Sequence, residues 1–527
     1  MPYLGDFAAS TPGKPAVISA VTGERISYAE LNDRSIRLAN LLGEFGLVRG
    51  DTFAVLAENH VRYFELYWAA VRAGYYVTFV NSHFAAEEVA YQITDSNSRV
   101  FISTLRMAEV AERVRERIDP SVRGLMIDGT AEGFASYEAA IAGASAEQPL
   151  RQPRGEAMLY SSGTTGRPKG IKRPLRDVEV DDPTATIALL SLCPGADSST
   201  VYLNPAPLYH AAPLYWSAGV HNLGGTVVVL GKFDPEEFLA AIERFRVTHT
   251  QVVPTMLIRV LKLPPERART HDLSSLRALV HAAAPCPPEV KEQFIDWLGP
   301  VVYEYYSGTE GSGLTFITSE EWLSHRGSVG RSLMGVPHIC DDFGAEVPAG
   351  TPGTVYFEQP QAPFEYHGDA QKTMDSRHPR HDNWTTIGDI GYLDEEGYLY
   401  LTDRRSFMII SGGVNIYPAE IENCLILHEK VADVAVFGLP DSEMGEFVQA
   451  VVRLAPGVPP GPETEDELKA FTRAHLAGYK VPRHIDFRGE LPRLETGKLA
   501  KYLLRREYLA ARTALCRWHH RQTGVSV

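Results

Sequence analysis

The sequence predicts an α/β protein with a large N-terminal part and a smaller C-terminal part. Short β-rich runs alternate with amphipathic helical segments, a pattern typical of βαβ units and mostly parallel sheets. The 527 residues are too many for one compact core, so two or more domains are expected. The composition changes near residue 400, and the roughly 120 residues that remain are enough for a small second domain.

The alternation is clearest in the first half of the chain. The segment Thr52–Leu56 is typical of a strand, and residues 61–73 then place aromatic and apolar side chains at helical spacing. Residues 226–230 are typical of a buried strand, and Asp234 followed by Pro235 predicts a capped helix. Further short apolar runs, which predict additional strands, lie at 251–253, 278–280, 301–304 and 397–402.

Composition and charge exclude several classes of protein. The net charge is −15, from 51 basic and 66 acidic residues, which argues against a general nucleic-acid binder. Five scattered cysteines without CxxC spacing argue against a disulfide framework or zinc site and fit a reducing cytoplasm. We find no signal peptide and no apolar run of about 18 residues, so no membrane span is expected.

The most informative segment is YSSGTTGRPKG, residues 160–170. Glycines allow a tight backbone turn close to a ligand, and successive amides with hydroxyl donors form a nest for phosphate oxygens. Because Lys169 is followed by Gly170 rather than by Ser or Thr, a P-loop kinase or ATPase is disfavoured. The candidate phosphate-binding residues are Ser161, Ser162, Gly163, Thr164, Thr165, Gly166 and Lys169.

This segment closely resembles the signature of the adenylate-forming superfamily, which includes acyl-CoA synthetases, peptide-synthetase adenylation domains and luciferases. Further motifs match in order from about residue 10 to about residue 508. The resemblance implies a large N-terminal domain of packed sheets and helices (residues 1–402), a hinge (403–406) and a small mobile α+β lid domain (407–527). The hinge departs from the family pattern at Asp403, Ser406 and Phe407.

Two motifs resemble the family's nucleotide site. In YSGTE, residues 306–310, the resemblance implies that Tyr306 stacks on adenine, Thr309 holds a phosphate oxygen and Glu310 binds Mg²⁺. Asp389 matches the aspartate that holds both ribose hydroxyls, although Ile387 replaces the usual threonine before Gly-Asp. Arg404 matches an arginine that also reaches the ribose.

Two motifs in the predicted lid domain resemble those that act in the family's two chemical steps, adenylate formation and transfer to coenzyme A. Lys498, within PRLETGKL, resembles the lysine that stabilises the charge developed during adenylate formation. Gly412 and Gly413 lie in a loop that lines the pantetheine tunnel of coenzyme A in relatives. We expect the catalytic residues to be Lys498, His210, Thr165 and Glu310.

The acyl pocket is predicted from three segments. His210 matches the family's aromatic-His segment and is expected to act as a gate or as a neighbour of the acyl carboxylate. Ser307 is small where acetate-specific relatives carry tryptophan, so a deeper pocket is expected. The complete predicted set for this pocket is His210, Tyr215, Trp216, His281, Ala282 and Ser307.

The resemblance implies an ATP-dependent acyl-CoA ligase that converts a carboxylic acid, ATP and CoA into acyl-CoA, AMP and pyrophosphate through an acyl-adenylate. No lysine or arginine in the pocket segments would pair with a second carboxylate, so an apolar medium- or long-chain fatty acid is expected. A bulky aryl or steroid side-chain acid is one alternative. A stand-alone amino-acid adenylation enzyme is another, disfavoured because His210 stands where those relatives have aspartate. A homodimer is also considered.

Overall fold

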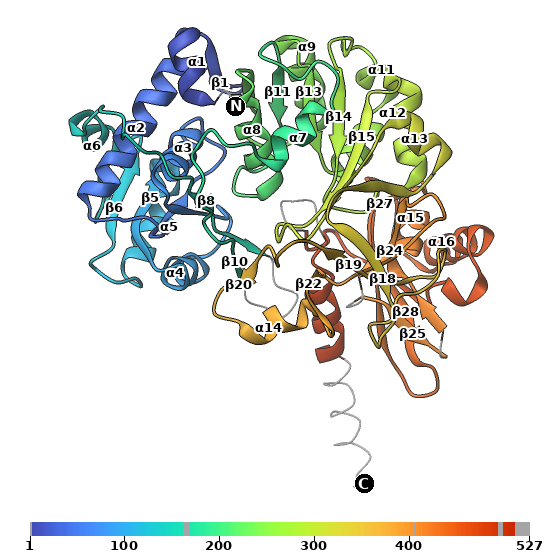
Figure 1. Ribbon diagram of the computed structural model, residues 1–527. Coiled ribbons are helices and arrows are strands. Elements are labelled where there is room, and N and C mark those ends of the chain that lie inside the picture. The colour runs from blue at the N-terminus through green and yellow to red at the C-terminus, as the bar shows by residue number, and fades with distance from the viewer. Residues whose placement is uncertain (1–2, 162–168, 405–406, 413, 494–498, 512–527) are drawn as a thin grey trace.

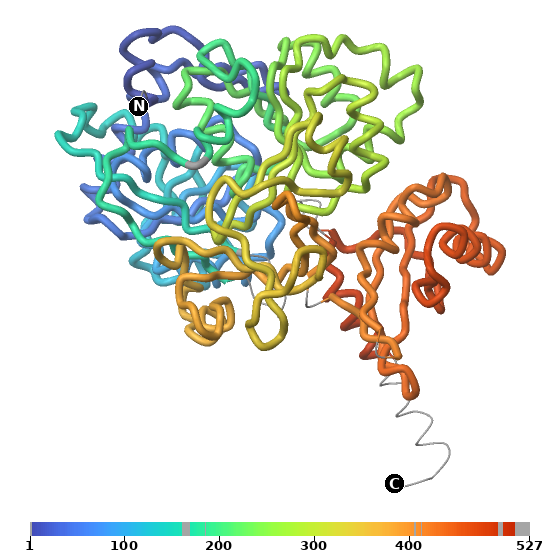
Figure 2. The backbone as a smooth tube through the Cα atoms, turned by 45° about the vertical axis from the view of Figure 1, so that its right-hand side comes forward, coloured from blue at the N-terminus to red at the C-terminus, as the bar shows by residue number. Residues whose placement is uncertain are grey.

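The computed structural model describes residues 3–161, 169–404, 407–412, 414–493 and 499–511. Figure 1 shows two large α/β regions side by side, with the C-terminal region packed below the second. Figure 2, turned by 45°, shows that the chain from about residue 407 onward forms a separate body. This arrangement follows the change of composition near residue 400.

The first region is built on a parallel sheet, which has six strands among the described residues, in the order β7-β6-β5-β3-β4-β8. The strands are β3 (Thr52–Leu56), β4 (Tyr76–Val80), β5 (Ser98–Thr104), β6 (Arg123–Ile127), β7 (Ala135–Ser136) and β8 (Glu156–Ala157). The helices of this region are α1 (Leu4–Ser10), α2 (Tyr28–Glu44), α3 (Tyr63–Ala73), α4 (Ala86–Asp95), α5 (Ala108–Arg115) and α6 (Tyr137–Gly143), with a 3₁₀ turn η1 (Leu105–Met107).

Helix α3 is buried along its whole length and is held by a buried acid. Glu65 is fully buried and pairs with Arg34 at 2.6 Å and with Arg62 at 2.7 Å. The Tyr137 hydroxyl donates to the same carboxylate at 3.0 Å. These contacts join α2, α3 and α6 around a satisfied charge, as a buried carboxylate requires.

The second region contains the largest sheet of the described chain, with 15 strands. Its parallel half runs through β1 (Pro15–Ser19), β12 (Thr226–Val229), β11 (Val201–Asn204), β13 (His249–Val252), β14 (Ala278–His281) and β15 (Val302–Ser307), with β2 (Arg25–Ser27) antiparallel at the edge. The helices α7 (Ala185–Ser191), α8 (Ala211–Asn222), α9 (Pro235–Phe245), α10 (Pro254–Leu261), α11 (Pro265–Ala268), α12 (Pro288–Leu298) and α13 (Ser319–Ser324) belong to it.

The other half of this sheet is antiparallel. It contains β16 (Leu314–Ile317), β17 (Ser328–Met334), β18 (Val336–Cys340), β19 (Gly353–Glu358), β21 (Arg377–His378), β22 (His381–Thr385), β23 (Asp389–Leu393) and β24 (Leu399–Arg404). The prediction of mostly parallel sheets is therefore confirmed for the first sheet and wrong for this half. Neighbouring strands such as β15 and β16 are joined by connections too short for a parallel crossover.

Two small sheets complete the described fold. A three-stranded sheet contains β9 (Leu159–Ser161), β10 (Lys169–Lys172) and β20 (Glu365–Tyr366), beside helix α14 (Ala370–Asp375). The C-terminal sheet contains β25 (Ile409–Ser411), β26 (Val414–Ile416), β27 (Val431–Asp441), β28 (Gly445–Leu454) and β29 (His484–Phe487). It packs with α15 (Pro418–Ile426), α16 (Pro462–His475) and the 3₁₀ turn η2 (Gly478–Lys480).

Several element predictions are confirmed. Strand β3 has the predicted bounds, and α9 begins at Pro235 with the Asp234 carboxylate accepting from two backbone N–H groups. Strand β24 runs to Arg404, so Asp403 and Arg404, two of the four residues of the predicted hinge, belong to a strand of the large sheet. The other two hinge residues lie outside the described chain, and the domain boundary stays a prediction.

Candidate active site

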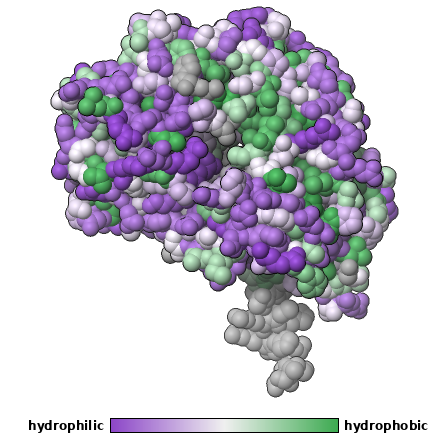
Figure 3. All heavy atoms as spheres, viewed as in Figure 1, coloured by the Kyte–Doolittle hydropathy of each residue, from purple (hydrophilic) through white to green (hydrophobic). Residues whose placement is uncertain are grey.

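A cavity of about 2650 Å³ lies between the first region, the second region and the C-terminal body. Its walls come from the ends of β14 and β15, the start of α8, strands β23 and β24, and helix α15. Figure 3 shows a hollow near the centre of this face, with hydrophobic side chains beside it. The carboxyl ends of parallel strands therefore open onto the cavity, the usual place for a ligand in an α/β sheet.

Tyr306, Asp389 and Arg404 form one cluster in the cavity wall, although they are far apart in sequence. The Tyr306 hydroxyl donates to Asp389 Oδ2 at 2.6 Å, and Arg404 Nε donates to Asp389 Oδ1 at 3.1 Å. Burial and the neighbouring Asp389 raise the pKa of Tyr306 well above its usual value, so the phenol stays a donor. The nearby carboxylate, above all, raises the pKa of Arg404. The carboxylate is thus fixed in orientation by two donors.

The turn that contains Thr309 and Glu310 is also held in place. Gly311 adopts a positive φ of 71°, and its N–H donates to the Gly308 carbonyl at 3.0 Å. Arg173 Nη2 donates to the Thr309 carbonyl at 2.6 Å. Glu310 Oε1 accepts from the Tyr366 hydroxyl at 2.9 Å, and both Thr309 and Glu310 line the cavity.

Glu310 has the chemistry that a magnesium site needs. Its hard carboxylate oxygens face the cavity, and Mg²⁺ in nucleotide enzymes is commonly held by one or two carboxylates, substrate phosphates and water. No group of three or more His, Cys, Asp or Glu that could hold a metal occurs among the described residues. A metal at Glu310 would therefore complete its coordination with nucleotide oxygens.

The predicted phosphate loop is only partly described. Ser161 ends β9 and pairs with Lys169 at the start of the antiparallel strand β10. Lys169 Nζ lies 2.9 Å from Asp369, and this hydrogen bond raises the pKa of Lys169. The remaining members of the predicted loop, Ser162, Gly163, Thr164, Thr165 and Gly166, lie outside the described residues. Their role stays a prediction.

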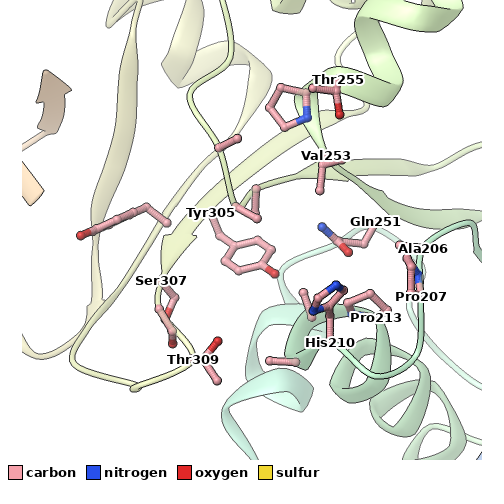
Figure 4. A pocket seen from close by; sticks show the side chains of 18 of the residues that line it. Ala206, Pro207, His210, Pro213, Gln251, Val253, Thr255, Tyr305, Ser307 and Thr309 are labelled. Atoms are coloured by element: carbon pink, nitrogen blue, oxygen red, sulfur yellow. The ribbon is translucent and has the colours of Figure 1, made fainter. Parts of the chain in front are cut away.

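Five of the six residues predicted for the acyl pocket line the cavity, namely His210, Tyr215, Trp216, Ala282 and Ser307, and the sixth, His281, is treated below. Figure 4 shows His210, Tyr305 and Ser307 facing a common space with Gln251, Val253 and Thr255. His210 precedes α8 and packs against the ring of Tyr209 at 4.4 Å. Ala282 also lines the cavity.

The aromatic residues of α8 are fixed by hydrogen bonds. Tyr215 donates its hydroxyl to Glu156 Oε1 at 2.8 Å, and burial holds the pKa of Tyr215 well above its usual value. Trp216 Nε1 donates to the Tyr305 hydroxyl at 3.3 Å. Ser307 Oγ donates to the Gly313 carbonyl at 2.7 Å, which keeps this small side chain close to the sheet.

His281 corrects the sequence prediction. It is fully buried at the end of β14 and is not among the residues that line the cavity. Its Nε2 lies 3.5 Å from Glu304, which also pairs with the buried Lys291 at 2.7 Å. Burial lowers the pKa of His281 to about 4, so it stays neutral. The segment HAAAP reaches the cavity through Ala282 to Pro285 instead, the residues that follow the end of β14 at His281.

The lid motifs are partly described. Lys498 and Gly413 lie outside the described residues, so both assignments stay predictions. The residues that follow Lys498, from Leu499 to Tyr502, line the cavity. Gly412 is not among the lining residues; it has a φ of 57°, and its N–H donates to the Met444 carbonyl at 2.7 Å. In this structure residues 499–502 of the C-terminal body line the cavity, and Gly412 does not.

The sequence analysis missed four residues of this site: Glu156, Arg173, Tyr305 and Tyr366. Arg173 lies three residues after the end of the phosphate segment, and Tyr305 directly precedes the YSGTE motif. Adjacency to a motif was therefore an available signal for these two. Glu156 and Tyr366 carried no comparable signal, because their partners are distant in sequence.

Comparisons with known proteins agree with these findings. Residues 4–366 match the AMP-binding enzyme family and residues 420–498 match the AMP-binding enzyme C-terminal domain. A long-chain-fatty-acid–CoA ligase, FadD13 of Mycobacterium tuberculosis, is 31% identical over 96% of this chain and 98% of its own length. A feruloyl-CoA synthase of an Amycolatopsis species is 33% identical over 92% of this chain and 94% of its own.

A solved structure is similar over nearly the whole chain. The o-succinylbenzoate CoA synthetase MenE of Bacillus subtilis, in complex with its acyl-adenylate intermediate, has a TM-score of 0.77 at 27% identity. The match covers 96% of this chain and 98% of that one. None of the described helices is long and apolar enough to cross a membrane. With both family regions matched in order around the cavity, the chain belongs to the AMP-binding enzymes, within the adenylate-forming superfamily that its motifs indicated.

Proposed function

We propose that the protein is an ATP-dependent acyl-CoA ligase for a carboxylic acid with a largely apolar body. The observation that carries the proposal is the cluster of Tyr306, Asp389 and Arg404 in the cavity wall, next to Glu310. This cluster offers an aromatic ring that could pack on the base of a nucleoside and an oriented carboxylate that could bind its ribose. Relatives named as CoA ligases or synthetases support coenzyme A as the acyl acceptor.

In the first half-reaction, a carboxylate oxygen of the acid attacks the α-phosphorus of ATP, and pyrophosphate leaves. Asp389 would accept the two ribose hydroxyls, while Tyr306 would pack on adenine. Glu310 would hold Mg²⁺, which supplies charge neutralisation at the phosphates. Lys498 would stabilise the negative charge that develops between the carboxylate and the phosphate.

In the second half-reaction, the thiol sulfur of coenzyme A attacks the acyl carbonyl carbon. The bond from this carbon to the phosphate oxygen breaks, AMP leaves, and the thiol proton passes to solvent. We propose that the lid turns about residues 403–406 between the steps, so that Gly412 and Gly413 replace Lys498 beside the cavity. Gly412, now outside the cavity lining, is consistent with this sequence of events.

The acid is expected to be a medium- or long-chain fatty acid or a bulky aryl acid. The apolar and aromatic lining, including Trp216, Val253 and Met256, favours an apolar body. The aromatic wall formed by Trp216 and Tyr305, whose rings lie 5.8 Å apart, specifically favours the aryl alternative. The two relatives above are named for one acid of each kind.

The variant Lys498→Ala separates the two steps. We expect it to abolish pyrophosphate release from ATP and acid, because no ammonium would then bridge the reacting anions. Thioester formation from presynthesised acyl-AMP and CoA should be largely retained. The variant Lys469→Ala in α16 serves as the control and should leave both steps unchanged, because Lys469 pairs with Glu465 and does not line the cavity. Equal loss of both half-reactions in Lys498→Ala would contradict the assigned role.

A further inference from the structure

Tyr305 occupies the pocket that the small Ser307 opens. The two residues are next-but-one neighbours on strand β15, so their side chains lie on the same face, opposite to Tyr306. Figure 4 shows the Tyr305 ring inside the pocket, with its hydroxyl directed toward Gln251 and His210. A phenol hydroxyl therefore stands in the cavity wall on the same strand face as Ser307.

The position of the Tyr305 hydroxyl is fixed by Trp216. An indole N–H can only donate, so the bond of 3.3 Å from Trp216 Nε1 uses the Tyr305 oxygen as an acceptor. Trp216 is 2% exposed and stacks on Tyr202 with an interplanar angle of 13°, which leaves it little freedom. The Tyr305 proton must consequently point away from Trp216.

The Tyr305 proton has no partner in the described part of the protein. Among the described residues, the hydrogen bond of the Tyr305 hydroxyl is the one that it accepts from Trp216. Burial raises the pKa of Tyr305 to about 12, so the group remains a donor at neutral pH. Tyr305 is 8% exposed and lines the cavity, so its hydroxyl borders the space that a ligand would fill. A ligand that displaces water from this donor leaves it unpaired unless the ligand itself supplies an acceptor.

We propose that Tyr305 is a specificity-determining residue, which donates a hydrogen bond to an oxygen carried on the body of the acyl substrate. The substrate class is then a carboxylic acid that is mainly apolar and has one hydroxyl, ether or carbonyl oxygen at the depth of Tyr305. This inference rests on the proposed acyl-CoA ligase function and narrows it. A site built around such a bond rejects an analogue that lacks the oxygen, because the donor is then buried unpaired.

The test uses matched acids that differ in one oxygen. The pairs are cinnamate with 4-hydroxycinnamate, cinnamate with 4-methoxycinnamate, and decanoate with 3-hydroxydecanoate. The measured quantity is the ratio of kcat/KM for the oxygenated acid to that for its partner, followed as pyrophosphate release in the presence of CoA. We expect the wild-type protein to favour the oxygenated acid about tenfold in at least one pair, the value of one good hydrogen bond.

Three variants test whether the Tyr305 hydroxyl causes this ratio of kcat/KM values. Tyr305→Phe should lower the ratio to about one, and Trp216→Phe should lower it less, because the hydroxyl remains but loses its orientation. Tyr303→Phe is the matched control. It removes a buried hydroxyl from the same strand, but Tyr303 packs on Phe316 and does not line the cavity. Its ratio should equal that of the wild type.

The outcomes separate the inference from the function on which it rests. A wild-type ratio near one in every pair, or an unchanged ratio in Tyr305→Phe, overturns the role of Tyr305 while acyl-CoA formation stands. Failure of every acid to release pyrophosphate overturns the proposed ligase and, with it, this inference.

Discussion

At the scale of single residues, the turn that contains Thr309 and Glu310 is held by an arginine that belongs to no predicted motif. Arg173 donates to the Thr309 carbonyl at 2.6 Å, and its guanidinium lies 5.8 Å from the centre of the Tyr215 ring. The contact joins the chain that follows β10 to the turn that presents Glu310. Arg173 thus contacts both the turn before Glu310 and the aromatic residue Tyr215 of the cavity wall.

We therefore predict that Arg173→Gln lowers the rate of adenylate formation by about tenfold or more and raises the Mg²⁺ concentration needed for half-maximal rate. The reason is the loss of a charge-assisted hydrogen bond that fixes the turn. Pyrophosphate release titrated with Mg²⁺ measures both effects. Arg151→Gln is the control, because Arg151 is exposed and pairs with Glu179 away from the cavity. An unchanged Mg²⁺ dependence in Arg173→Gln would remove the positioning role.

Sequence reasoning succeeded where a residue and its immediate neighbours form a recognisable motif. The motif around Tyr306 and the Gly388–Asp389 pair located two halves of one cluster before any geometry was known. The same reasoning failed for Glu156 and Tyr366, because their partners Tyr215 and Glu310 lie 59 and 56 residues away. It also misplaced His281, since a motif does not state which face of a strand each residue occupies.

At the scale of elements, helix α15 of the lid is bound to the large sheet through Asp403. Pro418 opens the helix and has no N–H, and the next N–H, from Ala419, donates to Asp403 Oδ2 at 2.9 Å. A carboxylate at a helix N-terminus satisfies a donor without an intrahelical partner and interacts favourably with the helix dipole. The aspartate of the predicted hinge therefore stabilises the position of α15 against the large sheet, which is the orientation that the proposed lid has in this structure.

We predict that Asp403→Ala slows pyrophosphate release about three- to tenfold, because this lid orientation loses one charged hydrogen bond. Thioester formation from presynthesised acyl-AMP should be equal to the wild type or faster. The variant Asp403→Asn keeps an acceptor oxygen. Its rate of pyrophosphate release should therefore lie between those of the wild type and Asp403→Ala. If Asp403→Ala slows both half-reactions equally, the contact does not select between lid orientations.

The elements themselves were predicted with unequal success. Strand β3 and helix α9 were located because a complete apolar pattern and a capping residue bounded them. The antiparallel half of the large sheet was not predicted. Taken one at a time, its strands from β16 to β24 have the same sequence pattern as the strands of a βαβ unit. Pairing direction depends on how the chain returns to the sheet, which short apolar runs do not encode.

At the scale of the whole molecule, buried neutral histidines make the free energy of unfolding depend on pH. His221 joins α8 to the rest of the core: its Nδ1 accepts from Trp68 Nε1 at 3.2 Å, and its Nε2 lies 3.2 Å from the Ala16 carbonyl. Burial lowers the pKa of His221 to about 3 and that of His281 to about 4. Protonation of His221 would place a second N–H against the indole donor.

The protein should consequently lose stability in mild acid. Between the unfolded pKa of about 6.5 and the folded value, the unfolded chain binds the extra proton, so stability falls as pH falls through this window. Each such histidine contributes about 1.4 kcal/mol per pH unit at full effect. Urea unfolding at pH 7, 6 and 5, followed by fluorescence, measures the trend. A midpoint that does not move between pH 7 and 5 would contradict it.

The central claim is that this cavity couples ATP to an acid and then to coenzyme A. The most direct measurement is pyrophosphate release from ATP, with and without CoA, across acetate, octanoate, palmitate, benzoate, cinnamate, cholate and several amino acids. We predict release with an apolar or aryl acid and a matching CoA thioester in the mass spectrum. Release with amino acids, or adenylate that never yields a thioester, would contradict the acyl-CoA ligase assignment.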